Sequence, residues 1–505
     1  MAVNQLKAGA ILNYASIALH TLISLLYTPY MLRMLGQSEY GLYALVGSVI
    51  SYLTVLDLGF GNAIVRYTAK YKAEGKTEEQ YRLFGMFISL YMIIGIVAFI
   101  AGLGLYFNVD NMFGETMTTY ELGRAKILML IMIFNLAISF PFNIYGSILT
   151  AYEDFVFRKI FSIATTLLKV AVMIALLHCG YKAVAIVILS TVINIVTIAV
   201  NYIYLKKNYT IKFTFGKFDW LLLREITIYS IWIFLNVIMD RIYWSTGQFV
   251  LGATVGTVAV SVFAIAIAIE AIFMNFSTAI VSVFLPRVTT MVVTTTKEEI
   301  SNTFIKIGRI QYIIVSFILV GYIVFGKQFI ILWAGSEYAP AYLMALLFLI
   351  SLAVPLIQNL GITILQARNQ MRFRSTLNII IAIISLGFQI VLSKYYGGLG
   401  CAIAISGALI IGQGIIMNWY YYKHQSLNIP NFWREIFKMS FVPAIFSIIG
   451  VIIFNYVQIN SFATLLISIT LFSLLYIPFF WKIGMNDRER ELFNGVLRKL
   501  KIKKI

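Results

Sequence analysis

Residues 83–106 read LFGMFISLYMIIGIVAFIAGLGLY, a run without a single charged side chain. A helix needs about 20 mostly apolar residues to cross the hydrocarbon core of a bilayer, so this run predicts a membrane-spanning helix. Similar runs recur along the chain, in which 60% of the 505 residues are hydrophobic and 12% are charged. Because soluble domains carry about 25% charged residues, this composition excludes an ordinary soluble enzyme.

The apolar runs predict an all-α polytopic membrane protein with about 14 transmembrane helices. Helices of this length satisfy all their backbone hydrogen bonds internally, which a bilayer requires. The predicted spans are residues 8–32, 40–63, 83–106, 125–149, 157–178, 182–204, 222–249, 255–285, 305–326, 340–365, 374–394, 398–421, 435–456 and 461–481.

The basic residues predict the orientation of these spans, because Lys and Arg are enriched in cytoplasmic loops. With the N-terminus inside, Lys169 and Arg241 fall within spans and most other cations fall in inner segments. Only six of the 39 Lys and Arg residues fall in outer segments: Arg33, Arg124, Lys126, Lys182, Lys327 and Lys394. We therefore expect both termini to be cytoplasmic, and the net charge of +18 needs no nucleic-acid partner.

Two pairs of motifs repeat at a spacing of 216 residues. Residues 148–158 (ILTAYEDFVFR) and 364–374 (ILQARNQMRFR) share Ile, Leu, Ala, Phe and Arg in register, and Leu35-Gly36 matches Leu251-Gly252. An even number of spans separates the copies, so the repeats are parallel, as in some transporters. The functional interpretation is two lobes rocking around a central cavity, and the alternative is a duplication without transport.

The repeat predicts two pseudo-symmetric six-helix lobes followed by two C-terminal helices. The expected parts are an N-terminal lobe at 1–204, a cytoplasmic linker at 205–221, a C-terminal lobe at 222–425, an accessory helix pair at 426–482 and a basic amphipathic tail at 483–505. The tail is expected to lie on the anionic inner leaflet, because apolar and basic side chains share one helix there.

The segment around the second span carries the most specific pattern. Residues 36–46 read GQSEYGLYALV, residues 56–61 read LDLGFG, and Arg66-Tyr67 follow. This stretch resembles the opening of the polysaccharide-unit flippases, which are the O-antigen and capsule-repeat transporters of the multidrug/oligosaccharidyl-lipid/polysaccharide (MOP) superfamily. The predicted span number, lobes and cytoplasmic termini resemble the architecture of the same family.

The resemblance implies a bacterial cytoplasmic-membrane flippase rather than an enzyme, with no cofactor. Such a protein moves undecaprenyl-diphosphate-linked oligosaccharide repeat units from the inner to the outer leaflet by alternating access. The resemblance implies coupling to a gradient of H⁺ or Na⁺. Three alternatives stay open: a multidrug or cation exporter, a lipid II flippase of the same superfamily, and a membrane polysaccharide polymerase.

Two basic residues inside spans are candidates for binding a diphosphate. Charged groups at membrane depth cost roughly 2.5–3.5 kcal/mol on insertion scales, so they usually face a cavity or a partner. Arg241 offers a planar fork that matches phosphate oxygens, and Lys169 offers a compact point charge. Asn236 and Trp244 lie on the same face of one helix as Asp240 and are candidates for contacting sugars. The alternatives are a buried ion pair for the cations and interhelical hydrogen bonds for the amides.

Three carboxylates inside spans, Asp57, Asp240 and Glu270, are candidates for ion coupling. A carboxyl group whose surroundings change during transport can take up and release a proton. The alternative is that each carboxylate serves helix packing. His20 has no second histidine nearby, and Cys179 and Cys401 form no CxxC pair, so the sequence predicts no metal site.

Overall fold

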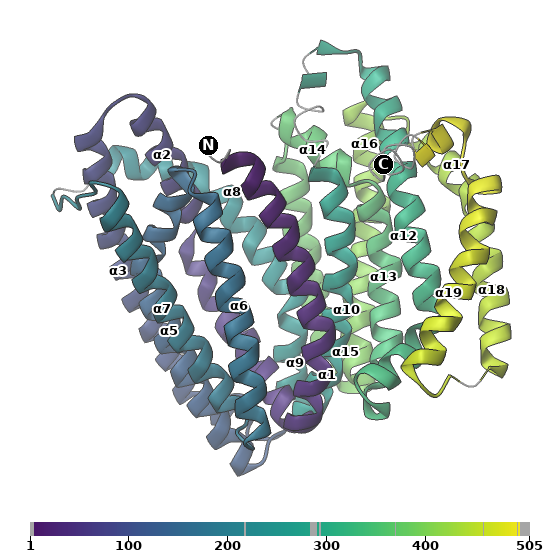
Figure 1. Cartoon of the computed structure of the whole chain (residues 1–505), viewed down its shortest axis with the longest axis horizontal. Coiled ribbons are helices and arrows are strands. Elements are labelled where there is room, and N and C mark those ends of the chain that lie inside the picture. Colours follow the sequence, from purple (N-terminus) through teal and green to yellow (C-terminus); the bar gives the residue numbers. More distant parts are fainter. Residues whose placement is uncertain are drawn as a thin grey trace, which may run out of the picture. The chain divides into compact units, whose positions relative to one another are not determined.

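The computed structural model describes residues 5–216, 219–282, 290–291, 294–368, 370–457, 459–491 and 493–494. Over these residues the chain is helical and contains no strand, which confirms the predicted all-α class (Figure 1). Ten helical segments are long and apolar enough to cross a membrane, or eleven when the bent pair formed by α13 (Ala341–Ile357) and α14 (Asn359–Ala367) counts as one span. The chain is therefore a multi-pass membrane protein.

Several of these segments contain more than one predicted span. Helix α1 (Gln5–Leu53) is broken at Gly36, whose φ of 76° is left-handed. Helix α15 (Arg372–Leu409) is broken in the same way at Gly397, with φ 55°. Glycine adopts this conformation without the steric cost of a Cβ atom, so the two positions allow a chain reversal between consecutive spans. The predicted spans on either side of each glycine are thus joined without a long loop.

The chain divides into two compact units. The first unit comprises Met1–Ala264 with Ile390–Gly398, and the second comprises Ile265–Gln389 with Leu399–Ile505. The division falls inside α10 (Thr257–Ser282) rather than at the predicted linker. The predicted lobes describe an internal repeat rather than a contact boundary, and they stay a prediction.

The first unit is built around helices from the N-terminal part of the chain. Its core contains Phe84, Phe87 and Tyr91 of α3, with Phe140 of α5 stacked on Tyr91 at a ring distance of 6.4 Å. Its elements are α1, η1 (Thr54–Asp57), α2 (Phe60–Ala73), α3 (Thr77–Phe107), α4 (Val109–Phe113), α5 (Thr119–Ala151), α6 (Phe155–His178), α7 (Ala183–Asn208), α8 (Trp220–Trp244), α9 (Thr246–Thr254) and the beginning of α10.

The predicted linker after α7 is docked on α3 rather than free. The backbone N–H of Thr214 donates to the carbonyl oxygen of Tyr81, and the Phe213 ring lies 6.2 Å from the ring of Phe84. A Cβ atom at Gly85 would lie 2.2 Å from the Thr214 carbonyl oxygen, so only glycine permits this approach. At the same end, burial and a hydrogen bond to the Asp154 carboxylate raise the pKa of Tyr209.

The two repeat motifs at 148–158 and 364–374 end helices at equivalent positions. Helix α5 ends at Ala151, and α14 ends at Ala367, which is its counterpart at the spacing of 216 residues. Helices α6 and α15 then begin at closely matching positions, Phe155 and Arg372. The other motif pair differs: Gly36 breaks α1, whereas Gly252 lies inside α9 and the left-handed turn comes at Gly256.

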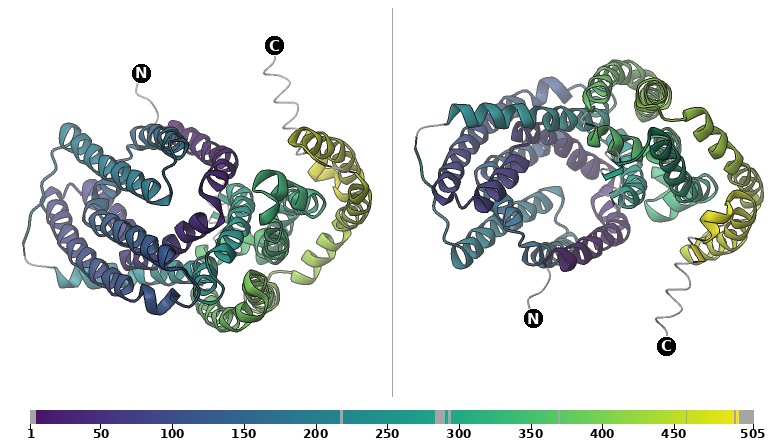
Figure 2. Two further views of the ribbon diagram at one scale, coloured as in Figure 1. Left: turned by 90° about the horizontal axis from the view of Figure 1, so that it is seen from below. Right: turned by 90° about the horizontal axis from the view of Figure 1, so that it is seen from above.

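The second unit packs its last helices against one long central helix. Tyr476 of α19 and Phe325 of α12 belong to a core that also takes in Met439 and Val442. Both views in Figure 2 show the C-terminal helices, drawn in yellow, lying side by side. The elements are the rest of α10, α12 (Lys297–Trp333), η2 (Ser336–Tyr338), α13, α14, α15 apart from Ile390–Gly398, η3 (Ile410–Ile416), α16 (Met417–Gln425), α17 (Ile429–Met439), α18 (Phe441–Tyr456), α19 (Phe462–Phe479) and η4 (Phe480–Gly484).

The predicted basic tail falls largely outside the described residues. Residues 487–491 are helical and are followed by the described pair 493–494, but Leu492 and residues 495–505 lie outside the described part. The Phe493 ring lies 6.1 Å from the ring of Trp481, at the end of the last span. The predicted contact between the tail and the inner leaflet stays a prediction.

Candidate functional site

Asp57 lies at a break in the second predicted span. Helix η1 ends at Asp57, Leu58 and Gly59 both have left-handed backbones with φ values of 52° and 75°, and α2 begins at Phe60. The Asp57 carboxylate accepts a 2.7 Å hydrogen bond from the Tyr91 hydroxyl, and backbone hydrogen bonds from Gly59 and Gly61. A carboxylate at this position satisfies N–H groups that the start of α2 leaves without helical partners.

Arg241 lies near the end of α8, against the C-terminal end of α1, which falls in the middle of the second predicted span. Its carbonyl oxygen is 3.5 Å from the Tyr52 hydroxyl, and beside it Ser51 Oγ donates to Ser245 Oγ over 3.0 Å. Arg241 is half-buried, and its Nε is buried without a hydrogen-bond partner. Within the described part of the chain, no carboxylate forms an ion pair with this guanidinium.

The depth of the other α8 candidates relative to Asp57 follows from how α8 packs against the segment from α1 to α2. The Tyr67 hydroxyl of α2 donates to Glu225 Oε1 of α8 over 2.9 Å, and together with the approach of Tyr52 to Arg241 this sets an antiparallel register. Interpolation between these two contacts places Asn236 at the depth of Asp57. Asn236 and Trp244 are half-buried and Asp240 is exposed, and all three make polar or ring contacts.

Lys169 lies on α6, which runs parallel to α1. Lys159 Nζ donates to Asn13 Oδ1 over 2.7 Å, and further along the helices the Tyr27 hydroxyl lies 3.3 Å from the Met173 sulfur. Lys169 precedes Met173 by one turn and therefore lies on the same side of α6. It is half-buried, and among the described residues no carboxylate lies within ion-pair distance of its ammonium group.

Glu270 is separated from the other candidates by the division into units. It lies on the part of α10 that belongs to the second unit, and its side chain is 3% exposed. The six remaining candidates, Asp57, Lys169, Asn236, Asp240, Arg241 and Trp244, all belong to the first unit. The structure brings the α8 candidates to the α1–η1 segment and places Lys169 on a different helix, α6.

A carboxylate that sequence analysis did not select holds three helices together. Glu121, in the first turn of α5, accepts hydrogen bonds from the Ser38 hydroxyl over 2.6 Å and from the Thr257 hydroxyl over 2.7 Å. It also accepts from the backbone N–H of Thr118 over 2.9 Å, which completes a capping box. These contacts join α5 to the part of α1 after Gly36 and to the start of α10. The sequence signal was the pattern Thr-x-x-Glu, which is typical of a helix start.

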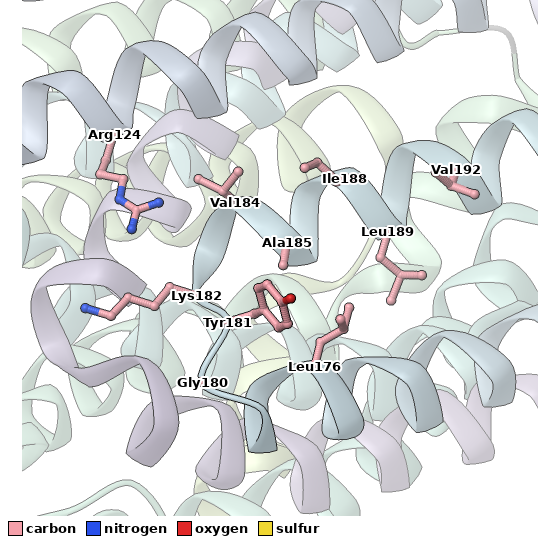
Figure 3. A pocket seen from close by; sticks show the side chains of 10 residues that line it. All are labelled: Arg124, Leu176, Gly180, Tyr181, Lys182, Val184, Ala185, Ile188, Leu189 and Val192. Atoms are coloured by element: carbon pink, nitrogen blue, oxygen red, sulfur yellow. The ribbon is translucent and has the colours of Figure 1, made fainter.

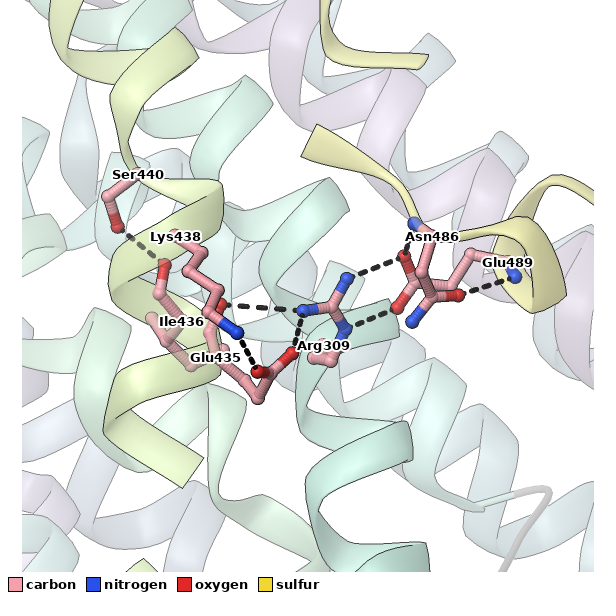
Figure 4. A network of polar contacts seen from close by, with 7 residues as sticks. All are labelled: Arg309, Glu435, Ile436, Lys438, Ser440, Asn486 and Glu489. Carbon is pink, nitrogen blue, oxygen red and sulfur yellow. Dashed lines mark hydrogen bonds and ion pairs between the residues drawn. The ribbon is translucent and has the colours of Figure 1, made fainter. Parts of the chain in front are cut away.

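Arg309 is a second residue whose role depends on tertiary contacts. It is 6% exposed and lies between two carboxylates (Figure 4). Its Nε and Nη2 bind the carboxylate of Glu489 over 2.6 and 3.0 Å, and its Nη1 binds Glu435 Oε2 over 2.8 Å. Asn486 caps the helical turn that carries Glu489. Because the three charged residues are far apart in the sequence, no local pattern indicates this network.

Two cavities lie away from the predicted site residues. One, of about 550 Å³, lies in the first unit between the ends of α5, α6 and α7 (Figure 3). The other, of about 420 Å³, lies in the second unit beside Arg309 and includes Lys306 and Arg488 in its wall. None of the seven predicted site residues lines either cavity. Over the described residues, no group of three or more His, Cys, Asp or Glu side chains is arranged to hold a metal ion.

The fold is similar to that of transporters of the MOP superfamily. The structure is similar to the lipid II flippase MurJ in an inward closed conformation, with a TM-score of 0.71 and 17% identity over 94% of this chain and 98% of that chain. It is also similar to an inward-facing MATE family multidrug resistance transporter, with a TM-score of 0.66 and 16% identity over 82% and 95% of the two chains. A third neighbour is a MOP superfamily transporter from Pyrococcus furiosus, with a TM-score of 0.54 and 13% identity over 85% and 96%.

The amino-acid sequence also matches the profile of a known protein family. Residues 6–292 match the profile of the family described as polysaccharide biosynthesis protein, so the chain belongs to that family. No curated protein sequence matches the chain. The solved structures that the chain resembles are those of transporters and of a flippase. The predicted family and fold class are thus confirmed, whereas the seven site residues stay predictions.

Proposed function

We propose that the chain is a flippase that moves undecaprenyl-diphosphate-linked oligosaccharide repeat units from the inner to the outer leaflet by alternating access. The membership of the polysaccharide biosynthesis family supports a glycan cargo. The fold supports a transporter that moves a bulky amphipathic substrate, because one of its structural neighbours is a lipid II flippase. We place the protein in a bacterial cytoplasmic membrane with both termini in the cytoplasm, as the distribution of basic residues indicates.

The observation that carries this proposal is the state of two cations in the first unit. Lys169 and Arg241 are both half-buried, and in the described part of the chain neither forms an ion pair with a carboxylate. A desolvated cation without a counterion is costly, so such residues are expected to meet an anion in the working protein. A diphosphate supplies that anion, with Arg241 as the fork and Lys169 as the point charge.

The neighbours of Arg241 on α8 complete the proposed substrate site. Asn236 and Trp244 follow one another at helical spacing on the face that carries Asp240. The amide of Asn236 offers donors and acceptors for sugar hydroxyls, and the indole of Trp244 offers an apolar ring face. The membrane-embedded lipid tail of the cargo would remain in contact with the bilayer throughout.

We further propose that Asp57, Asp240 and Glu270 couple transport to an H⁺ or Na⁺ gradient. Gly75-Lys76-Thr77 is no P-loop, because Lys70 stands where that motif requires glycine, so the proposed energy source is an ion gradient, the membrane potential or product removal. Moving two negative charges outward across an inside-negative potential of 100 mV releases about 4.6 kcal/mol. Transport whose rate and extent are unchanged when both the potential and the gradients are abolished would contradict this part of the proposal.

The proposal is tested in proteoliposomes that contain the full chain and a fluorescent undecaprenyl-diphosphate-linked trisaccharide. A membrane-impermeant reductant quenches only the probe in the outer leaflet, so protein-dependent quenching beyond that leaflet reports flipping. We expect flipping by the wild-type protein and by Lys327→Ala, an exposed outer-segment cation, and strongly reduced flipping by Arg241→Ala with Lys169→Ala. Full activity of the double variant would remove both residues from the site.

The same vesicles separate the alternatives. Fluorescent lipid II that flips faster than the trisaccharide probe would identify a lipid II flippase, and uptake of ethidium in preference to either lipid would identify a cation exporter. Extension of the trisaccharide chain by the purified protein would identify a polymerase. Any of these three outcomes would overturn the proposed cargo.

A further inference from the structure

A cavity of about 550 Å³ opens in the first unit where α6 turns into α7 (Figure 3). Two cations, Arg124 of α5 and Lys182 of the turn, lie together at one end. The remainder is lined by the Tyr181 ring and mainly by aliphatic side chains, namely Leu176, Val184, Ile188, Leu189 and Val192. The cavity is therefore cationic at one end and apolar along its length.

The Arg124 side chain is held in place from one edge of its guanidinium group. Its Nε donates to the Tyr120 hydroxyl over 3.0 Å and lies 3.7 Å from Glu39 Oε1, and the guanidinium stacks over the Tyr120 ring at 5.4 Å. Within the described residues its two terminal nitrogens form no hydrogen bond. The side chain is thus positioned while its terminal N–H groups remain available to an anion.

Lys182 supplies a positive charge that Glu39 does not neutralise. Its side chain is exposed and lies at the same end of the cavity as the Arg124 side chain. Among the described residues no carboxylate lies within ion-pair distance of Lys182, whereas Glu39 lies close to Arg124. The cationic end therefore keeps a net positive charge, which favours a phosphate over a neutral group.

The apolar part of the cavity has the shape of a groove between neighbouring helices. Ile188 is 47% exposed and Val192 is 50% exposed, so the outer part of α7 presents aliphatic surface. The small side chain of Ala185 leaves space in the groove between Leu176 of α6 and Leu189 of α7. Gly180, with φ 83°, lies in the turn that joins the two helices. In a membrane such a surface is covered by hydrocarbon chains.

We propose that this cavity binds one anionic phospholipid. The phosphate lies between Arg124 and Lys182, and one acyl chain follows the groove between α6 and α7. A free phosphate would satisfy only the cationic end, and a neutral lipid would satisfy only the groove. Basic pockets between transmembrane helices on the cytoplasmic side of a membrane bind anionic lipid head groups, and the same charge complementarity applies to Arg124 and Lys182 at the predicted outer ends of α5 and α7. This inference concerns the lipid around the transporter and is independent of which cargo the chain moves.

Native mass spectrometry of the full chain tests the site. The protein is released from detergent in the presence of phosphatidylglycerol or phosphatidylcholine, and the fraction that retains one lipid is measured. We expect retention of phosphatidylglycerol over phosphatidylcholine, and about a tenfold loss of that retention in Arg124→Ala with Lys182→Ala, which corresponds to about 1.4 kcal/mol. Lys327→Ala removes an exposed cation elsewhere and should bind as the wild type does.

Two further measurements guard against a merely structural effect. Lys182→Met alone removes an exposed side chain that has no ion-pair partner among the described residues, so it should fold normally and still weaken retention of phosphatidylglycerol. Ala185→Phe fills the groove and leaves both cations in place, so it should weaken retention of phosphatidylglycerol although the cationic end is intact. Equal binding of the two lipids, unchanged retention in Lys182→Met, or displacement of the lipid by inorganic phosphate at low concentration would overturn the proposal.

Discussion

The Tyr91 hydroxyl of α3 donates a 2.7 Å hydrogen bond to the Asp57 carboxylate at the point where η1 gives way to α2. Asp57 also accepts from the backbone N–H groups of Gly59 and Gly61, so one carboxylate joins α3 to a helix break inside a span. Broken helices at membrane depth occur where the freed backbone groups find partners within the protein. The relationship gives Asp57 a structural task in addition to the proposed coupling role.

These two tasks are separated by Asp57→Asn. Asparagine keeps an oxygen that accepts from Tyr91 and from the helix start, so the variant should fold and lose less than about 1 kcal/mol of stability. Because the amide cannot take up a proton or balance a cation, we expect flipping that no longer responds to an imposed H⁺ or Na⁺ gradient. The measurement is the gradient dependence of reductant quenching in proteoliposomes.

Tyr91→Phe is the matched control for Asp57→Asn. It removes the hydrogen bond while the carboxylate remains, so gradient dependence should persist at a lower stability. An Asp57→Asn protein that responds to gradients as the wild type does would leave Asp57 with the helix-capping task alone.

Replacement of the proposed phosphate ligands should weaken cargo binding in different ways. Arg241→Lys keeps the charge but loses the planar fork, and Arg241→Ala loses both. Because hydrogen bonds to charged groups contribute about 1.5–3 kcal/mol, we expect Arg241→Ala to bind cargo about 10–100-fold more weakly, with Arg241→Lys between it and the wild type. The measurement is the concentration of unlabelled lipid-linked trisaccharide that halves flipping of the fluorescent probe.

Lys169→Met tests the second ligand, because methionine preserves the length and apolar stem of the side chain. A drop in affinity comparable to that of Arg241→Lys is expected. If both Lys169→Met and Arg241→Ala bound the cargo as tightly as the wild type, the diphosphate would have to lie elsewhere.

Removal of the cation at the centre of the second-unit network should destabilise that unit. In Arg309→Met the carboxylates of Glu435 and Glu489 lose their shared partner, and breaking a buried ion pair from one side costs about 3–5 kcal/mol. Cys401 is completely buried, so its reaction with a thiol-reactive dye during heating reports unfolding, in a Cys179→Ser background that removes the exposed thiol. We expect a clearly lower midpoint for Arg309→Met.

Lys438→Ala is the control for this experiment, because Lys438 pairs with Glu435 at 2.7 Å but is 58% exposed. Exposed pairs contribute about 0–1 kcal/mol, so the midpoint should hardly move. Equal shifts for Arg309→Met and Lys438→Ala would show that the network does not stabilise the unit.

Loss of the Glu121 carboxylate should loosen the end of the first unit where α1, α5 and α10 meet. Glu121→Ala leaves Ser38 and Thr257 without their acceptor and removes the capping box of α5. Several hydrogen bonds to a charged group are lost together, so we expect a loss of about 2–4 kcal/mol. Glu121→Gln retains one side-chain oxygen and should be intermediate in thermal unfolding followed by circular dichroism. A midpoint of Glu121→Ala equal to that of the wild type would contradict this role.

The apolar runs were sufficient to predict the all-α class and the approximate positions of most long helices, but not the breaks inside them. A span such as 83–106 carries its own signal, because bilayer thickness sets its length and its backbone is satisfied internally. The equivalence of Ala151 and Ala367 could also be predicted from the sequence, because the motifs at 148–158 and 364–374 share residues in register around both alanines. The match at Gly252 was misleading in detail because the chain reverses at Gly256 instead.

The polar contacts were not readable, because they join residues that are distant in the sequence. No sequence pattern connects Tyr91 with Asp57, which are hydrogen-bonded in the structure. Arg309 belongs to the cations that the sequence assigns to inner segments, although it is buried between two carboxylates. The docking of the predicted linker at 205–221 on α3 could not be predicted either, because it depends on the absence of a side chain at Gly85. Hydropathy indicates how deep a residue lies, but not which residue of another helix meets it.

Because α5 ends at Ala151 and α14 ends at the equivalent Ala367, a substitution near one helix end can be compared with the same substitution near the other. A change introduced into the turn after one alanine has a counterpart, in the same polypeptide, after the other. Comparing the two single changes with the combined one shows whether the two turns contribute equally to transport.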